Sequence, residues 1–148
     1  MQTPYFNSVK TLLQLVLIPL VMASCQKETP DHCARTMAGI SGTYKPTGLT
    51  YKPGSTSPEQ DYFAIKDACE KDDLVDLNLN GTYNYRDIGL VCSPEGSNSG
   101  TWSVSGNRVI SDGLADGIIQ NFDCRTLVIA GSDVIVPGDR LTLTMERQ

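Results

Sequence analysis

Cysteine is the residue type with the clearest chemical potential in this 148-residue chain. Four of its five cysteines, Cys33, Cys69, Cys92 and Cys124, are far apart, and none forms a Cys-x-x-Cys pair. Structural zinc sites ordinarily use such pairs, so zinc is the weaker interpretation. An even number of cysteines in an exported chain is typical of disulfides, and we expect two bridges, which can be drawn in three ways.

The fifth cysteine, Cys25, follows a segment typical of an export signal. Lys10 precedes an apolar run at residues 12–22, which is shorter than the roughly 20 apolar residues that a membrane-spanning helix needs. Ala23, Ser24 and Cys25 follow the run, and residues 20–25 (LVMASC) resemble a lipobox, in which small residues precede an acylated cysteine. An ordinary secretory signal cleaved nearby and a buried apolar helix are the alternatives. We expect residues 1–24 to be a lipoprotein signal peptide and Cys25 to carry lipid, palmitate included.

Catalytic and metal-binding chemistry finds little support in the residue types. His32 is the only histidine, so no Ser-His-Asp triad or multi-histidine metal site can be assembled. Residues 76–81 (DLNLNG), with Asp87 at the twelfth position, resemble a calcium loop, but that position normally holds Glu and helices flank such loops. Adjacent Asp72 and Asp73 would point to opposite faces of a strand, which favours a solvated acidic run over glycosidase chemistry. We predict no catalytic residue, no metal and no cofactor.

The balance of charge excludes one class of partner. The net charge is −5, it becomes −6 when Lys10 leaves with the leader, and no cluster of Lys and Arg interrupts the acidic composition. Binding to phosphate groups needs concentrated positive charge. Nucleic acid is therefore not an expected partner.

Aromatic side chains are the candidates for a ligand pocket. Tyr44, Tyr83, Tyr85 and Trp102 offer large apolar surfaces with polar ends, which suit a binding site for a small apolar molecule. The alternative is that they pack the core, because small barrels fill their interiors with such side chains.

The elements that position these residues are predicted to be β-strands. After residue 41, turn-forming residues recur roughly every 8 to 12 positions, which is typical of an all-β sandwich or barrel. In the hairpin at residues 74–85, a three-residue loop ending at Gly81 sets Leu77 opposite Tyr83 and Val75 opposite Tyr85. A two-residue turn would instead mix apolar and polar residues on one face.

That register also favours one of the three disulfide pairings. Continued outward, it brings position 69 opposite position 91, and one bulge near residues 87–89 would align Cys69 with Cys92. Cys33 and Cys124 then pair by elimination.

The remaining strands complete the predicted fold. A two-residue turn at residues 106–107 places Val104 opposite Val109, and further strands are expected at residues 42–51, 118–122, 127–129 and 140–146. The total is about seven or eight antiparallel strands, which fits an up-and-down barrel. We predict a signal peptide at residues 1–24, a lipidated tether at 25–40 and a disulfide-stapled barrel domain at 41–148.

Several short motifs resemble, in order, the lipocalin-like lipoproteins of Bacteroides-type bacteria. They are Gly42-Thr43-Tyr44, Cys69-Glu70-Lys71-Asp72-Asp73, Leu77-Asn78-Leu79-Asn80-Gly81-Thr82-Tyr83, Cys92, Gly100-Thr101-Trp102 and Leu127-Val128-Ile129. Tyr44 stands where Trp is common in that family. The resemblance implies a small β-barrel without catalytic residues. We expect a lipid-anchored, extracytoplasmic, non-enzymatic binding protein of a Gram-negative outer membrane, on its periplasmic or cell-surface face.

Two functions are compatible with this expectation. The first is binding of a small apolar ligand or of an envelope component. The second is a protein-interaction module, such as an inhibitor or accessory subunit, with a filled barrel and no ligand cavity.

Overall fold

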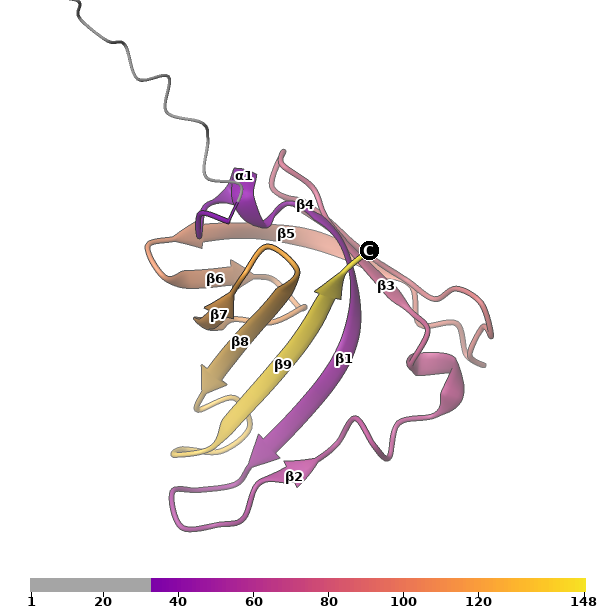
Figure 1. Ribbon diagram of the computed structural model, residues 1–148. Coiled ribbons are helices and arrows are strands. Elements are labelled where there is room, and N and C mark those ends of the chain that lie inside the picture. Colours follow the sequence, from indigo (N-terminus) through magenta and orange to yellow (C-terminus); the bar gives the residue numbers. More distant parts are fainter. Residues whose placement is uncertain (1–32) are drawn as a thin grey trace, which may run out of the picture.

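The strands of the chain form one antiparallel sheet that closes on itself (Figure 1). The computed structural model describes residues 33–148. The predicted signal peptide at residues 1–24, the predicted lipidation site Cys25 and His32 lie outside the described residues. Within residues 33–148, no helix has the length and apolar character needed to cross a bilayer.

Eight strands make the wall of the barrel. Neighbours along the sheet are β1-β3-β4-β5-β6-β7-β8-β9, and β1 also pairs with β9, so the sheet has no free edge where those two meet. The two-residue strand β2 pairs only with the far end of β1. The predicted all-β, up-and-down barrel is thereby confirmed. Its strands are β1 (Gly42–Lys52), β2 (Gln60–Asp61), β3 (Leu74–Leu77), β4 (Thr82–Arg86), β5 (Asn98–Ser105), β6 (Arg108–Ser111), β7 (Gly117–Phe122), β8 (Thr126–Ser132) and β9 (Arg140–Arg147).

Both predicted hairpin registers are confirmed. In β3–β4, Leu77 lies opposite Tyr83 and Val75 opposite Tyr85. Gly81 closes the turn with a φ of +86°, a conformation that glycine adopts without the penalty a Cβ would bring. In β5–β6, residue 104 lies opposite residue 109, as the two-residue turn requires.

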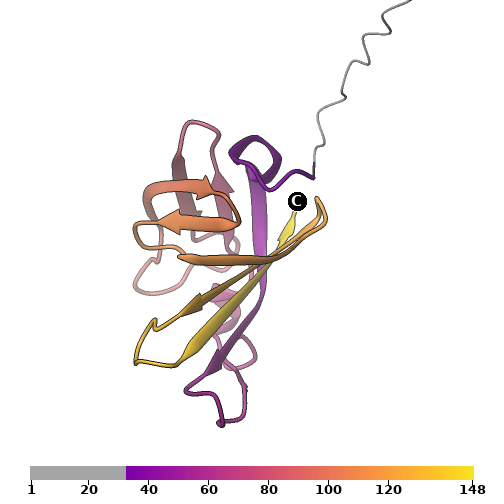
Figure 2. The ribbon, with the colours of Figure 1, turned by 90° about the vertical axis from the view of Figure 1, so that its left-hand side faces the viewer.

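One end of the barrel is closed by the short helix α1 (Met37–Ile40). Ile40 is fully buried, and Arg147 at the end of β9 donates hydrogen bonds to the carbonyl oxygens of Gly39 and Ile40, at 2.6 and 3.3 Å. Figure 2 shows α1 lying over this end, opposite the loop that joins β8 to β9. Residues 33–40, assigned to the tether from their polar composition, therefore belong to the folded domain.

Below α1 the interior is filled with side chains. The inward-facing residues of this half pack into one cluster, and we call this part of the barrel the closed half. Because an eight-stranded barrel encloses just enough space for side chains or one small ligand, the filling leaves no room at this end. The cluster includes Ile40, Tyr44, Leu77, Tyr83, Trp102, Val109, Ile119, Phe122, Leu127 and Met145.

The other half is open. On β9 the alternation of apolar and polar residues predicts one buried face, yet only Met145 is fully buried, whereas Leu141 and Leu143 are half-buried like the threonines between them. Leu141 faces Tyr51 and Leu143 faces Leu49 across the β1–β9 pair. These apolar side chains point into the barrel but lack a full set of neighbours.

The wall also has a lateral gap between β1 and β3. These strands pair only at residues 42–44 of β1, and the register of β1 shifts at Pro46. Residues 62–73, here named the side segment, cover the gap and contain the 3₁₀ turn η1 (Ala68–Glu70). The N–H of Phe63 donates to the carbonyl of Leu49 at 3.0 Å, which fixes the segment to β1.

Candidate functional site

Two apolar cavities occupy the open half. The side cavity, of about 230 Å³, lies behind the side segment, and the end cavity, also about 230 Å³, lies beneath the β6–β7 and β8–β9 loops. Leu114 and Leu141 line both, so the two spaces adjoin. The side cavity is lined by Pro46, Leu49, Phe63, Lys66, Glu70, Val75, Tyr85, Leu114, Leu141 and Leu143.

The lateral wall of the side cavity is held in place by local chemistry. Glu70 accepts a hydrogen bond from the Asp67 backbone and an ion pair from Lys66, one turn earlier. The hydrogen bond from Lys66 is the main cause of the lowered pKa of Glu70. Lys71 donates to the carbonyl oxygen of Ala64 at 3.0 Å. Phe63 is therefore presented to the cavity by a braced segment.

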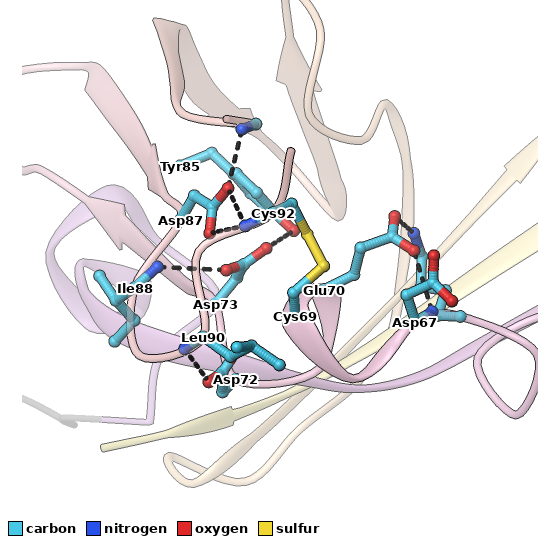
Figure 3. The surroundings of a disulfide bond; sticks show 12 residues. Asp67, Cys69, Glu70, Asp72, Asp73, Tyr85, Asp87, Ile88, Leu90 and Cys92 are labelled. Atoms are coloured by element: carbon cyan, nitrogen blue, oxygen red, sulfur yellow. Dashed lines mark hydrogen bonds and ion pairs between the residues drawn. A yellow bond between two sulfur atoms is a disulfide. The ribbon is translucent and has the colours of Figure 1, made fainter. Parts of the chain in front are cut away.

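Tyr85 separates the side cavity from a polar cavity of about 440 Å³ around the Cys69–Cys92 disulfide, since its side chain lines both. Its hydroxyl donates to Asp73 at 2.7 Å (Figure 3). Burial raises the pKa of Tyr85, and the hydrogen bond to Asp73 raises it further. The phenol stays protonated and keeps its ring against the apolar space.

The acidic residues around this disulfide hold the β4–β5 loop. Asp73 accepts from the N–H of Ile88, Asp72 from that of Leu90 and Asp87 from that of Cys92 (Figure 3). Asp87 also accepts from the N–H of Gly96. Asp73 is only 2% exposed and Asp87 only 8%. The interpretation of Asp72 and Asp73 as a solvated acidic run is therefore wrong for Asp73. Buried carboxylates need partners, and Asp73 and Asp87 have them.

Both disulfides expected from the sequence are present. Cys69 bonds to Cys92, and Cys33 bonds to Cys124 in the β7–β8 turn. The first pair does not arise from strand register, however. Strand β3 begins at Leu74 and β4 ends at Arg86, so Cys69 comes from η1 and Cys92 from the following loop.

The β8–β9 loop, residues 133–139, forms one rim of the open end and is organised by a single carboxylate. Asp139 is 2% exposed and accepts from the N–H groups of residues 134–136 at 2.7 to 2.8 Å and from the Tyr51 hydroxyl at 3.1 Å. Burial alone would raise the pKa of Asp139, but these hydrogen bonds outweigh it and the pKa is lowered. The loop is thereby tied to β1 across the mouth of the barrel.

Stability is expected to fall at acid pH through this group. A carboxyl whose folded-state pKa is depressed contributes stability that is present above its unfolded-state pKa, about 3.9, and is lost as the pH falls through the folded-state value. Asp139→Asn should therefore lower the urea midpoint at neutral pH and flatten the decline below about pH 4. Glu95→Gln, which alters an exposed carboxylate, is the matched control. A decline as steep in Asp139→Asn as in the wild type would contradict this role.

The four aromatic residues predicted to bind ligand fall into two places. Tyr44, Tyr83 and Trp102 belong to the filled cluster of the closed half, with the indole N–H of Trp102 donating to the carbonyl of Asn78 at 2.9 Å. Tyr85 alone of the four lines the side cavity. The aliphatic lining was not singled out from the sequence, because alternation marks which face a residue occupies but not its depth along the barrel.

The side chains that match the calcium-loop spacing do not come together at one site. Asp76 receives two hydrogen bonds from Arg86, which chiefly account for its lowered pKa, and a third from Thr43. Asn80 accepts from the Thr82 N–H in the turn, and Asp87 lies in the loop beyond β4. Within the described part of the chain, no three His, Cys, Asp or Glu side chains are grouped to hold a metal ion.

Comparison with known proteins gives one match. The model of a family described as a lipocalin-like domain matches residues 40–128, from the end of α1 into β8. No curated protein and no solved structure matches the chain.

Proposed function

The chain belongs to the lipocalin-like domain family, and from this premise we propose that it is a non-enzymatic binding protein that takes up a small apolar ligand in the open half of its barrel. A lipocalin-like barrel is a binding-protein fold. The proposal places the ligand in the joined side and end cavities.

The observation that carries this proposal is the half-burial of apolar side chains inside the barrel. Leu141 and Leu143 face inward on β9, yet neither is fully buried, because the space before them holds no side chain. Covering such surface contributes roughly 25 cal/mol per Å². An apolar molecule is the kind of ligand that gains from filling that space, and the eight-stranded wall has room for one small ligand.

Polar groups at one edge of the side cavity set the ligand's orientation. Lys66 and Glu70 line it but satisfy one another in an ion pair, and the Tyr85 hydroxyl is engaged by Asp73. The remaining lining is apolar. We therefore expect a ligand with an apolar body, and any polar end of the ligand would lie beside the Lys66–Glu70 pair.

Filling the side cavity is expected to weaken ligand binding. In Leu143→Trp the larger side chain enters the cavity, and affinity for N-phenyl-1-naphthylamine, a small apolar fluorophore, should fall at least about tenfold, a loss of about 1.4 kcal/mol. The control is Leu79→Trp, at an exposed position in the β3–β4 turn of the closed half. Fluorescence titration measures both. Equal affinity in Leu143→Trp and the wild type would contradict a ligand site in the open half.

The cellular setting is a further part of the proposal. We place the protein at the outer membrane of a Gram-negative, Bacteroides-type cell, anchored by lipid on Cys25, and the support is the lipobox-like sequence before that residue. Native mass spectrometry of the protein from its own envelope would report the acylated terminus and a bound ligand together.

A second candidate function rests on the filled closed half. Each cavity is smaller than the roughly 300 to 1,000 Å³ of ordinary small-molecule pockets. A barrel that serves as a protein-interaction module would need no cavity. Copurification of a protein partner, with no small molecule and no fluorophore binding, would favour it.

A further inference from the structure

The β8–β9 loop carries three consecutive exposed aliphatic side chains. Val134, Ile135 and Val136 are 48%, 67% and 44% exposed. They lie at the open end, and Val134 also lines the end cavity beside Leu114 and Leu141. Single exposed apolar residues are common on protein surfaces, but three in succession at the mouth of a cavity call for a cause.

The backbone N–H groups of this loop are already hydrogen-bonded within it. The N–H groups of residues 134–136 donate to Asp139, that of Gly138 donates to the Asp133 side chain, and those of Asp133 and Asp139 donate within the loop. Pro137 has no N–H to satisfy. Every backbone N–H group from 133 to 139 is therefore paired inside the loop, so no unpaired donor opposes the entry of this loop into a medium without water.

The small size of the apolar patch at residues 134–136 indicates whether a protein or a bilayer covers it. A stable protein–protein interface buries about 800 Å² per partner, contributed by roughly 20 to 30 residues. Three half-exposed side chains at a loop tip are far too few for a second copy of the chain or another protein. A bilayer sets no such minimum, because a small apolar tip can enter it by itself.

The length of chain before Cys33 is compatible with this placement. Cys33 is eight positions after Cys25, which gives a reach of at most about 29 Å. Strand β1, with 11 residues tilted as in other barrels, gives a height of about 28 Å. At full extension this segment is therefore about as long as the barrel wall is high.

We propose that residues 134–136 dock the open end of the barrel onto a lipid bilayer, with Ile135 entering the acyl region. The net charge, −5 for the whole sequence and −6 once Lys10 is removed with the leader, makes uncharged or zwitterionic lipid the surface of choice, since anionic headgroups repel the chain. Docking sets the end cavity against the acyl chains, so an apolar molecule passes between membrane and barrel without crossing water. The docking itself requires no occupied cavity and stands apart from ligand binding.

The test uses tryptophan at the loop tip and lipids that quench it. The full chain carrying Ile135→Trp is reconstituted into phosphatidylcholine vesicles whose acyl chains bear bromine, and its emission is compared with that of the wild type, whose Trp102 is buried. The matched control is Leu79→Trp, 63% exposed against 67% for Ile135 but at the opposite end. Thermal unfolding of both variants checks that the fold is retained.

The expected result is strong quenching of the emission added by Ile135→Trp and none of that added by Leu79→Trp. Raising the share of phosphatidylglycerol should weaken the quenching. Quenching at position 79 alone, at both positions, or at neither would overturn the proposal. A fluorophore titration on the same variants keeps the ligand site separate, because a failure of docking leaves that affinity unchanged.

Discussion

Replacing Cys33 and Cys124 together by alanine is expected to lower the free energy of unfolding by about 4 to 5 kcal/mol. The two cysteines are 91 residues apart, and a cross-link that closes so long a loop removes about 4.6 kcal/mol of chain entropy from the unfolded state. Domains of this size have only about 5 to 15 kcal/mol in total. The double variant should therefore unfold at a much lower urea concentration.

The second disulfide provides the comparison. Cys69 and Cys92 are 23 residues apart, so their replacement by alanine is expected to cost about 3.4 kcal/mol on the same basis. Urea unfolding followed by circular dichroism measures both double variants against the wild type. If the Cys69/Cys92 variant is the less stable of the two, native contacts around that bridge, and not loop length, set the contribution.

Trp102→Ala is expected to cost about 3 to 5 kcal/mol, the range for removing a large aromatic side chain from a core. Trp102 is 3% exposed and packs in the filled core of the closed half, so its truncation leaves a void. Its indole N–H is also bonded to Asn78, and its backbone N–H to Gly81. These two hydrogen bonds join strand β5 to the β3–β4 turn.

A milder variant separates packing from hydrogen bonding. Trp102→Phe keeps an aromatic ring but leaves the Asn78 carbonyl without its donor, and we expect a loss of about 1 to 3 kcal/mol. Chemical unfolding of both variants gives the two values. A loss in Trp102→Ala no larger than in Trp102→Phe would show that ring packing contributes little at this position.

The sequence predicted the hairpins well because their turns are chemically specific. Gly81 takes a positive φ that few residues tolerate, and alternation then leaves one register for the β3–β4 pair. The same reasoning placed Val104 opposite Val109. Local rules sufficed wherever a tight turn joined neighbouring strands.

Long-range features were harder to predict. The sequence predicts the Cys69–Cys92 pair only if the β3–β4 register is extended beyond the real ends of the two strands. The pairing is right, but the two cysteines lie in η1 and in the loop after β4 and not on paired strands. The closure of β1 on β9 and the helix α1 depend on contacts across most of the chain. A polar, proline-containing segment gave no sign that Ile40 would be buried.

The candidate site illustrates the same limit. Leu49, Leu114, Leu141 and Leu143 are ordinary apolar residues of strands and loops, and only the closed barrel reveals that they line an unfilled space. The size of Tyr44, Tyr83 and Trp102 makes them candidate ligand contacts from the sequence, whereas in the fold they fill the closed half. Depth along a barrel axis is a property of the assembled sheet, not of a strand.

The position of the Cys33 bridge has a mechanical consequence. A pull on the segment that precedes Cys33 is delivered through sulfur to Cys124, in the turn between β7 and β8, before it reaches α1 or the first residues of β1. The seam between β1 and β9, which extends from Tyr44 to Lys52, is thus spared the load that would open it pair by pair. We therefore expect drag on the domain to load the covalent bridge and the β7–β8 turn before it loads the β1–β9 pairing.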